Sequence, residues 1–165
     1  MAKGIRIRAA REDDVPHLLD CIRGIAAYEK LAHEVEATES SVQESFFGAR
    51  PAAEALVAEH DGKKVGFAVY FQTYSTFTSR PGMWLEDVYV QPESRGHGIG
   101  EAVLRELGKI CVERGYPRLE WTVLDWNEPA LRFYERLGAR PMDAWTTQRL
   151  AGEALAALAD KGAVA

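Results

Sequence analysis

MWLEDVYVQPESRGHGIG, residues 83–100, contains an apolar-rich segment, a glycine-rich loop and the start of a periodic pattern. The segment over 83–90 is typical of a strand, and Ile99, Val103 and Leu107 begin a helix that should end near Gly115. Such a helix points free N–H groups and its positive end at the loop, which suits a pyrophosphate. Arg95 adds positive charge at the rim. The alternative is that the glycines only form a tight strand-to-helix turn.

Two familiar nucleotide-binding loops do not fit this stretch. A nucleotide-hydrolysing P-loop requires Lys and then Ser or Thr after its last glycine, whereas Glu101 follows Gly100 here. A dinucleotide-binding loop requires a third small residue, and Val103 occupies that position. One feature still favours a dinucleotide-binding loop: Asp125 ends the next expected strand, about where the ribose-binding acid would lie. We therefore favour neither of these two functions.

Outward from this stretch, the pattern alternates between strands and helices. Asp61-Gly62 is a hairpin signal between two strands, and Asp13 or Asp14 can cap the first helix. This order predicts an α/β protein with a mixed sheet, in a single domain over 1–165. The core should cover about 5–150 and a tail should begin after about 152. The further expected elements are a strand over 5–9, a helix from 13, a short helix over 38–48, two strands within 55–74, a buried strand over 119–124, a helix over 127–138, a last strand over 142–150, and a short terminal helix or frayed end.

Composition narrows the class of protein. The chain has 165 residues, 47% hydrophobic and 27% charged, with a formal charge of −5. This argues against nucleic-acid binding and is compatible with a cationic substrate. No segment has the length of a signal-peptide core or a membrane span. Cys21 and Cys111 are expected to be buried thiols, and the four histidines show no metal-ligand spacing. We expect a cytoplasmic protein without metal, membrane or nucleic-acid partners.

Four blocks of the sequence carry a resemblance to a known family. QPESRGHGIG resembles the acetyl-CoA pyrophosphate loop of the GNAT superfamily of N-acetyltransferases, with Arg95, Gly98 and Gly100 in register. AAYEKL, WLEDVYV and WNEPALRFYERLGA, in this order, are similar to the diamine (spermidine/spermine) acetyltransferase branch. The resemblance spans Ile5 to about Leu150 and implies the GNAT fold, in which a central mixed, mostly antiparallel sheet is flanked by helices. It also implies acetyl-CoA as co-substrate.

Acetyl transfer to an amine needs a proton acceptor. An alkylamine has a pKa of about 10.4, so roughly one molecule in two thousand is neutral at pH 7. Glu86 and Asp87 are candidates, but adjacent strand residues point to opposite faces, so both can address one cleft only if the strand is bulged. The resemblance implies such a distortion and places both near the amine, with Glu86 as the water-linked base. The alternative is a structural ion pair.

Other residues could stabilise the intermediate and the leaving group. A backbone N–H of Val88 or Tyr89 could stabilise the oxyanion. The resemblance implies that Tyr134 protonates the leaving thiolate and that Asn127 binds the pantetheine arm, although it can also cap its helix. It further implies an acetyl-CoA site made by Val88, Tyr89, Val90, Arg95, Gly96, His97, Gly98, Ile99, Gly100, Asn127 and Tyr134.

The acceptor site is also inferred from the resemblance. Tyr28 and Glu29 match a segment that lines the amine site, although a solvated helix end is the alternative. Trp145 lies where the polyamine enzymes contribute substrate contacts, and the segment around it implies a homodimer paired through C-terminal strands.

The sequence leaves three functions open. The first is acetyl transfer from acetyl-CoA to a primary amine of a small cationic acceptor, by direct attack in a ternary complex. The acceptor would be a polyamine, a diamine or a lysine-like amino acid. The second is acetyl transfer to a protein or peptide, and the third is a non-catalytic acyl-CoA-binding module.

Overall fold

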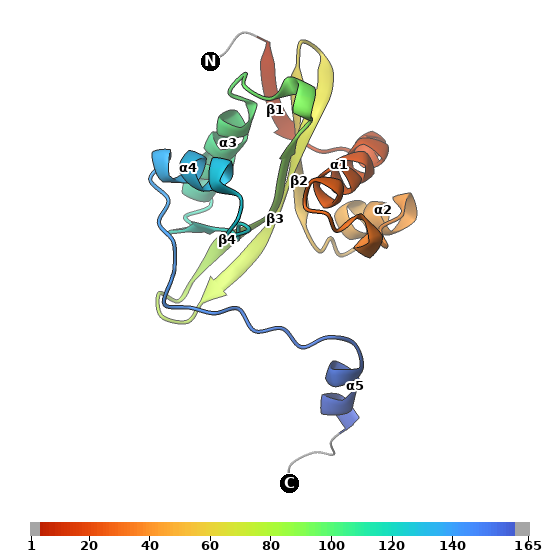
Figure 1. Ribbon diagram of the computed structural model, residues 1–165, viewed down its shortest axis with the longest axis vertical. Helices are drawn as coiled ribbons and strands as arrows, with labels where there is room; N and C mark the ends of the chain where they lie inside the picture. The colour runs from red at the N-terminus through yellow and green to blue at the C-terminus, as the bar shows by residue number, and fades with distance from the viewer. Residues whose placement is uncertain (1–3, 161–165) are drawn as a thin grey trace. The chain divides into compact units, whose positions relative to one another are not determined.

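The sheet is the centre of the fold (Figure 1), in a computed structural model that describes residues 4–160. Within that range it contains five strands in the order β1-β2-β3-β4-β5. The first three neighbouring pairs are antiparallel and β4 with β5 is parallel, so the predicted mixed, mostly antiparallel sheet is confirmed. The strands are β1 (Ile5–Ala9), β2 (Glu54–His60), β3 (Lys63–Ser75), β4 (Arg80–Val90) and β5 (Leu119–Glu120).

Helices cover both faces of this sheet. In Figure 1, α1 and α2 lie on one face and α3 lies on the other. The helices are α1 (Val15–Tyr28), α2 (Glu39–Phe47), α3 (Ile99–Glu113), α4 (Glu128–Arg136) and α5 (Gly152–Asp160), with short 3-10 helices at Glu12–Asp14, Ala32–Glu34 and Pro92–Ser94. The helices predicted from the sequence are all present, and the tail forms a short helix rather than a frayed end.

Apolar packing fixes the helices on each face. Leu18 and Leu19 of α1 join Val57, Phe67 and Val69 of the sheet in one buried cluster. On the opposite face, α3 buries the apolar residues that repeat at helical spacing, and Cys111 Sγ lies 3.8 Å from Met83 Sδ of β4. Both cysteines are free and buried, as the sequence predicts.

A buried carboxylate fixes the start of α1. Asp14 is fully buried and accepts hydrogen bonds from Arg8 at 2.6 and 3.0 Å. Lys64 Nζ lies 2.6 Å from the same carboxylate. These cations hold the pKa of Asp14 well below its usual range, with the Arg8 hydrogen bonds as the main cause. The network therefore links β1 and β3 to the first turn of α1.

The hairpin between β2 and β3 forms where the sequence indicates it. Asp61 and Gly62 both have positive φ, of 50° and 79°, which a two-residue turn matching the twist of the strands requires. The long strands β3 and β4 follow this turn. Their pairing provides the backbone on which the candidate site is built.

Two predicted strands are not found as expected. The segment 119–124 forms a strand only at Leu119–Glu120, because β5 pairs only with Met83 and Trp84 of β4. Beyond Trp84, β4 changes register, and the parallel ladder ends there. The segment 142–150 contains no strand, so the prediction of a last strand is wrong; no strand is present within 123–160 that could pair with it.

The chain divides into two compact units, 1–122 and 123–165. The first contains the whole sheet with α1, α2 and α3, and the second contains α4 and α5. Each unit is described by itself below. The domain boundaries expected from the sequence stay a prediction.

Candidate active site

A β-bulge lies at the centre of the candidate site. On β4, Leu85 pairs with Tyr70 and Asp87 pairs with Val69, so Glu86 is the extra residue between them. Without the bulge, Leu85 and Asp87 would share a face of the sheet. The distortion of this strand that the resemblance implies is therefore present, and the roles of Glu86 and Asp87 stay predictions.

The bulge brings acidic side chains to the α1 face. Residues paired across antiparallel strands share a face, so Asp87 lies on the face of Val69, which belongs to the cluster packed under α1. Leu85 lies on the face of Tyr70, whose ring is 5.9 Å from the Arg114 guanidinium. Arg114 caps the C-terminal end of α3. Asp87 thus faces α1, whereas Leu85 packs into the core on the α3 face.

Three predicted site carboxylates interact electrostatically. Burial, followed by the negative charges of Glu86 and Glu29, raises the pKa of Asp87 to about 6. Burial also raises the pKa of Glu29, the residue after α1. We call Glu29, Glu86 and Asp87 the acidic cluster. An ammonium group bound beside it would relieve the repulsion among these charges.

Glu86 is exposed but hydrogen-bonded. Its Oε2 accepts a hydrogen bond of 2.8 Å from the indole Nε1 of Trp84. Trp84 pairs with Phe71 and so lies on the same face as Val69 and Asp87. Trp84 is not among the site residues predicted from the sequence, although its spacing of two residues from Glu86 is a signal for such a contact.

Part of one edge of β4 has no strand beside it. Val88 and Tyr89 pair with Ala68 and Phe67 of β3 on one side. On the other side, among residues 4–160, β5 reaches only as far as Trp84. An extended ligand could therefore pair with the backbone at Val88–Val90, as the resemblance implies.

The glycine loop, Ser94–Gly100, leads into α3. Gly96 and Gly98 have φ of 82° and 80°, and Gly98 is the N-cap residue of the helix. A Cβ at either position would meet nothing within 4 Å. Positive φ, rather than crowding within the protein, is what selects glycine there.

The first turn of α3 presents amides to this loop. The first bond of the helix runs from the Ala102 amide to the Gly98 carbonyl at 3.0 Å, so the amides of Ile99, Gly100 and Glu101 make no intrahelical bond. These amides and the positive end of the helix have the geometry that suits an anion, and the binding of a pyrophosphate there stays a prediction. His97 lies at the edge of the loop, where its ring is 5.0 Å from that of His60.

Arg95 is turned toward aromatic side chains. Its Nε donates to the Val90 carbonyl at 2.9 Å, and its guanidinium lies 5.1 Å from the ring of Tyr28 and 5.7 Å from that of Tyr89. The ring of Tyr89 contacts α1 so closely that a Cβ at Gly24 would lie 2.7 Å from it. Arg95 therefore brings the loop into contact with Tyr28 at the end of α1.

The second unit holds Asn127 and Tyr134. Asn127 is the N-cap of α4, and its side chain accepts a hydrogen bond of 3.4 Å from the Ala130 amide. Burial raises the pKa of Tyr134, which keeps the phenol protonated, as a general acid requires. Trp145 is 74% exposed and its amide bonds to the Met142 carbonyl at 3.1 Å. The functional roles of these three residues stay predictions.

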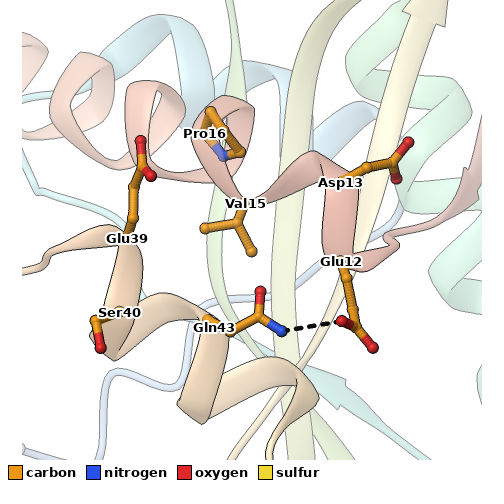
Figure 2. Close-up of a pocket in the computed structure, with 7 residues that line it drawn as sticks. All are labelled: Glu12, Asp13, Val15, Pro16, Glu39, Ser40 and Gln43. Carbon is orange, nitrogen blue, oxygen red and sulfur yellow. Dashed lines mark hydrogen bonds between the residues drawn. The ribbon is translucent and has the colours of Figure 1, made fainter.

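A separate depression lies at the start of α1 and α2, and Figure 2 shows its lining. Gln43 Nε2 donates to Glu12 Oε2 at 3.3 Å within it. It contains none of the site residues predicted from the sequence. The lining residues are Glu12, Asp13, Val15, Pro16, Glu39, Ser40 and Gln43.

The described residues contain neither a metal cluster nor a membrane helix. No group of three or more His, Cys, Asp or Glu within 4–160 could hold a metal ion. In the same range, every helix is too short or too polar to cross a membrane.

Comparison with known proteins decides the family. The model of the acetyltransferase (GNAT) family matches residues 22–139. The chain belongs to the GNAT acetyltransferase family. This GNAT chain is 37% identical over 168 residues to the thialysine N-epsilon-acetyltransferase of Sus scrofa, covering 95% of the chain and 98% of that protein. Members of the family use acetyl-CoA as co-substrate, so the glycine loop and the open edge of β4 are the features to test for its binding.

One further sequence relative and one solved structure are also similar to this acetyltransferase. It is 33% identical over 141 residues to the spermidine/spermine N(1)-acetyltransferase-like protein 1 of Homo sapiens, covering 81% of the chain and 20% of that protein. An integron cassette protein from the mobile metagenome of V. cholerae has the same fold, with a TM-score of 0.81 and 23% identity, covering 96% of this chain and 99% of the other. The predicted GNAT fold is confirmed.

Proposed function

We propose that this acetyltransferase moves an acetyl group from acetyl-CoA to a primary amine of a small cationic acceptor, by direct attack in a ternary complex. The observation that carries the proposal is the bulge at Glu86, which brings Asp87 to the α1 face, where the charges of Glu86 and Glu29 act on it. The same strand continues into the open backbone edge and the glycine loop. Donor and acceptor can therefore meet along one strand.

The donor would bind along the second half of β4 and the start of α3. The amides of the first turn of α3 suit the pyrophosphate, and Gly96 and Gly98 leave space for it. The backbone at Val88–Val90 would pair with the pantetheine arm, and Asn127 would add a side-chain contact. A backbone N–H of Val88 or Tyr89 would stabilise the oxyanion that forms on the thioester carbonyl.

The acceptor amine would be deprotonated beside the acidic cluster. Glu86 takes the proton through a water molecule, and the neutral nitrogen attacks the thioester carbon. Collapse of the tetrahedral intermediate breaks the carbon–sulfur bond, and Tyr134 protonates the leaving thiolate. The Tyr134 oxygen then regains a proton from the acetylated nitrogen, which leaves a neutral amide. Tyr134 is half-buried, and burial raises the pKa of its phenol, which supports this role.

The remaining carboxylates would recognise a second positive charge. Asp87 is half-buried beside like charges, and a second ammonium on the acceptor would offset their repulsion. Diamines and amino acids with a side-chain amine both carry such a group, whereas simple alkylamines do not. The thialysine acetyltransferase covers more of the chain at higher identity than the spermidine/spermine relative, so we place lysine analogues first among acceptors.

We also propose a cytoplasmic homodimer. The second unit exposes Met142, Trp145 and Leu150, of which Met142 is 64% exposed. Exposed apolar side chains in one segment are typical of a partner surface, and the resemblance implies a second copy. Two free, buried cysteines are compatible with a reducing compartment.

Initial-rate kinetics test the proposed function. Rates measured while both acetyl-CoA and the acceptor are varied should give intersecting reciprocal lines, which indicate a ternary complex. Glu86→Gln should lower kcat, whereas Asp87→Asn should mainly raise the KM of a dicationic acceptor. Parallel lines, or a Glu86→Gln variant with full turnover, would contradict the proposed chemistry.

A further inference from the structure

The proposed base lies at a poorly constrained position. Glu86 is the extra residue of the β-bulge, so its backbone is outside the regular β3–β4 ladder. Its side chain is exposed and has three rotatable bonds, so it could adopt many rotamers in water. A base that works through a positioned water needs a fixed carboxylate. Some other group must therefore hold Glu86 in place.

Trp84 is placed to do this. The bulge leaves Trp84 on the α1 face, as its pairing with Phe71 shows, and its indole N–H donates to Glu86 Oε2 at 2.8 Å. An indole N–H can only donate, so it matches an ionised carboxylate oxygen. The hydrogen bond makes Oε2 the less basic oxygen, so Oε1 is the one that would take the proton.

The tryptophan is itself held firmly. It lies on a strand with neighbours on both sides, since it pairs with Phe71 of β3 and with Glu120 of β5. It is half-buried, and the residues before and after it, Met83 and Leu85, are buried in the core. Trp84, in the regularly paired part of β4, thus provides a fixed hydrogen-bond donor for Glu86 in the bulge.

We propose that Trp84 is a positioning residue, whose indole N–H fixes the Glu86 carboxylate in the orientation that serves the reaction. The inference rests on the proposed function, because it assigns Trp84 a role only through Glu86. Packing alone would require the ring of Trp84 but not its N–H group. The two explanations therefore differ in what removal of the N–H does.

Turnover in a double-mutant cycle separates them. Trp84→Phe keeps an aromatic ring and removes the donor, and it should lower kcat about 10-fold to 100-fold, the usual effect of a lost hydrogen bond to a charged group. The KM of acetyl-CoA should not change. In a Glu86→Gln background, Trp84→Phe should have almost no further effect on kcat, because both variants remove the same function.

A matched variant tests whether the loss of any one side-chain hydrogen bond to the sheet lowers turnover. Tyr116→Phe removes the bond of 2.6 Å from the Tyr116 hydroxyl to Gln72 Oε1, on the α3 face. It should leave kcat unchanged. Equal effects of Tyr116→Phe and Trp84→Phe would show that general loosening of the sheet, and not the position of Glu86, determines turnover.

The outcomes distinguish this inference from the proposed function. If Glu86→Gln lowers kcat but Trp84→Phe has no effect, or an effect that adds fully to that of Glu86→Gln, the positioning role is wrong and the proposed function stands. If Glu86→Gln has full turnover, the base is misassigned and the inference falls with it.

A spectroscopic measurement serves if Trp84→Phe does not fold. In the otherwise unchanged protein, Glu86→Ala should move the NMR resonance of the Trp84 indole N–H and speed its exchange with solvent. The other three indole signals should stay in place. An unmoved Trp84 signal would overturn the inference.

Discussion

Asp87 is expected to oppose folding while it serves binding. Its pKa is raised from the ordinary 3.8 to about 6, chiefly by burial and then by the charges of Glu86 and Glu29. That difference corresponds to about 3 kcal/mol of free energy at neutral pH. Because the folded-state pKa is the higher one, the ionised group destabilises the fold. The cost is present in full above about pH 6 and disappears as the pH falls below 3.8.

Asp87→Asn should therefore stabilise the protein. The amide has nearly the same shape and carries no charge, so we expect a gain in the free energy of unfolding of about 1 to 3 kcal/mol at pH 7.5. The upper figure is reached only if the amide finds hydrogen-bond partners. Urea denaturation of both proteins at pH 7.5 and at pH 4 measures this gain, which should be much smaller at pH 4.

A second variant controls for the loss of a negative charge, and Asp87→Asn should weaken acceptor binding while it stabilises the fold. Glu36→Gln removes one negative charge at an exposed position and should leave the stability unchanged. Asp87→Asn should at the same time raise the KM of a dicationic acceptor. A variant that is equally stable or less stable than the parent at pH 7.5 would refute the assignment of Asp87 as a half-buried carboxylate that destabilises the fold when ionised.

Three further predictions concern the donor loop, the acid and the assembly. Gly98→Val places a β-branched residue at a φ of 80° and adds bulk beside the free amides, so calorimetry should show weaker acetyl-CoA binding, whereas Gly108→Ala, inside α3 with open space around it, should bind normally. Tyr134→Phe should lower turnover roughly 10²-fold to 10⁴-fold and change acetyl-CoA binding little, and near-normal turnover would leave Tyr134 only a packing role. Light scattering at micromolar concentration should give the mass of a dimer, and a monomer mass would reject the proposed assembly.

Most of the fold could be predicted because its signals are local. The turn at Asp61-Gly62 and the helical spacing from Ile99 to Cys111 each need only a few neighbouring residues to be recognised. The two errors concern strands, at 119–124 and 142–150, which need a partner that is distant in the sequence. For the first, the bulge at Glu86 ends the parallel pairing of β4 and β5 after Glu120. The apolar residues that follow Glu120 therefore do not pair with β4.

The candidate site was predictable in its residue types but not in its contacts. The acidic pair suggested a bulge, because two adjacent carboxylates on a regular strand face opposite ways. The sequence could not show that Trp84 donates to Glu86, since the bulge changes which residues share a face. Nor could it show that Arg95 lies against Tyr28 and Tyr89, which depends on how the loop folds back.

Turnover with a panel of acceptors tests the central claim most directly. The purified protein would be assayed with acetyl-CoA and, in parallel, thialysine, lysine, spermidine, a short diamine, a simple alkylamine and a lysine-containing peptide. We predict acetylated product with the small amines that carry a second ammonium group, with thialysine and lysine ahead of spermidine and the alkylamine far behind. Turnover confined to the peptide, or binding of acetyl-CoA without turnover of any amine, would contradict the account.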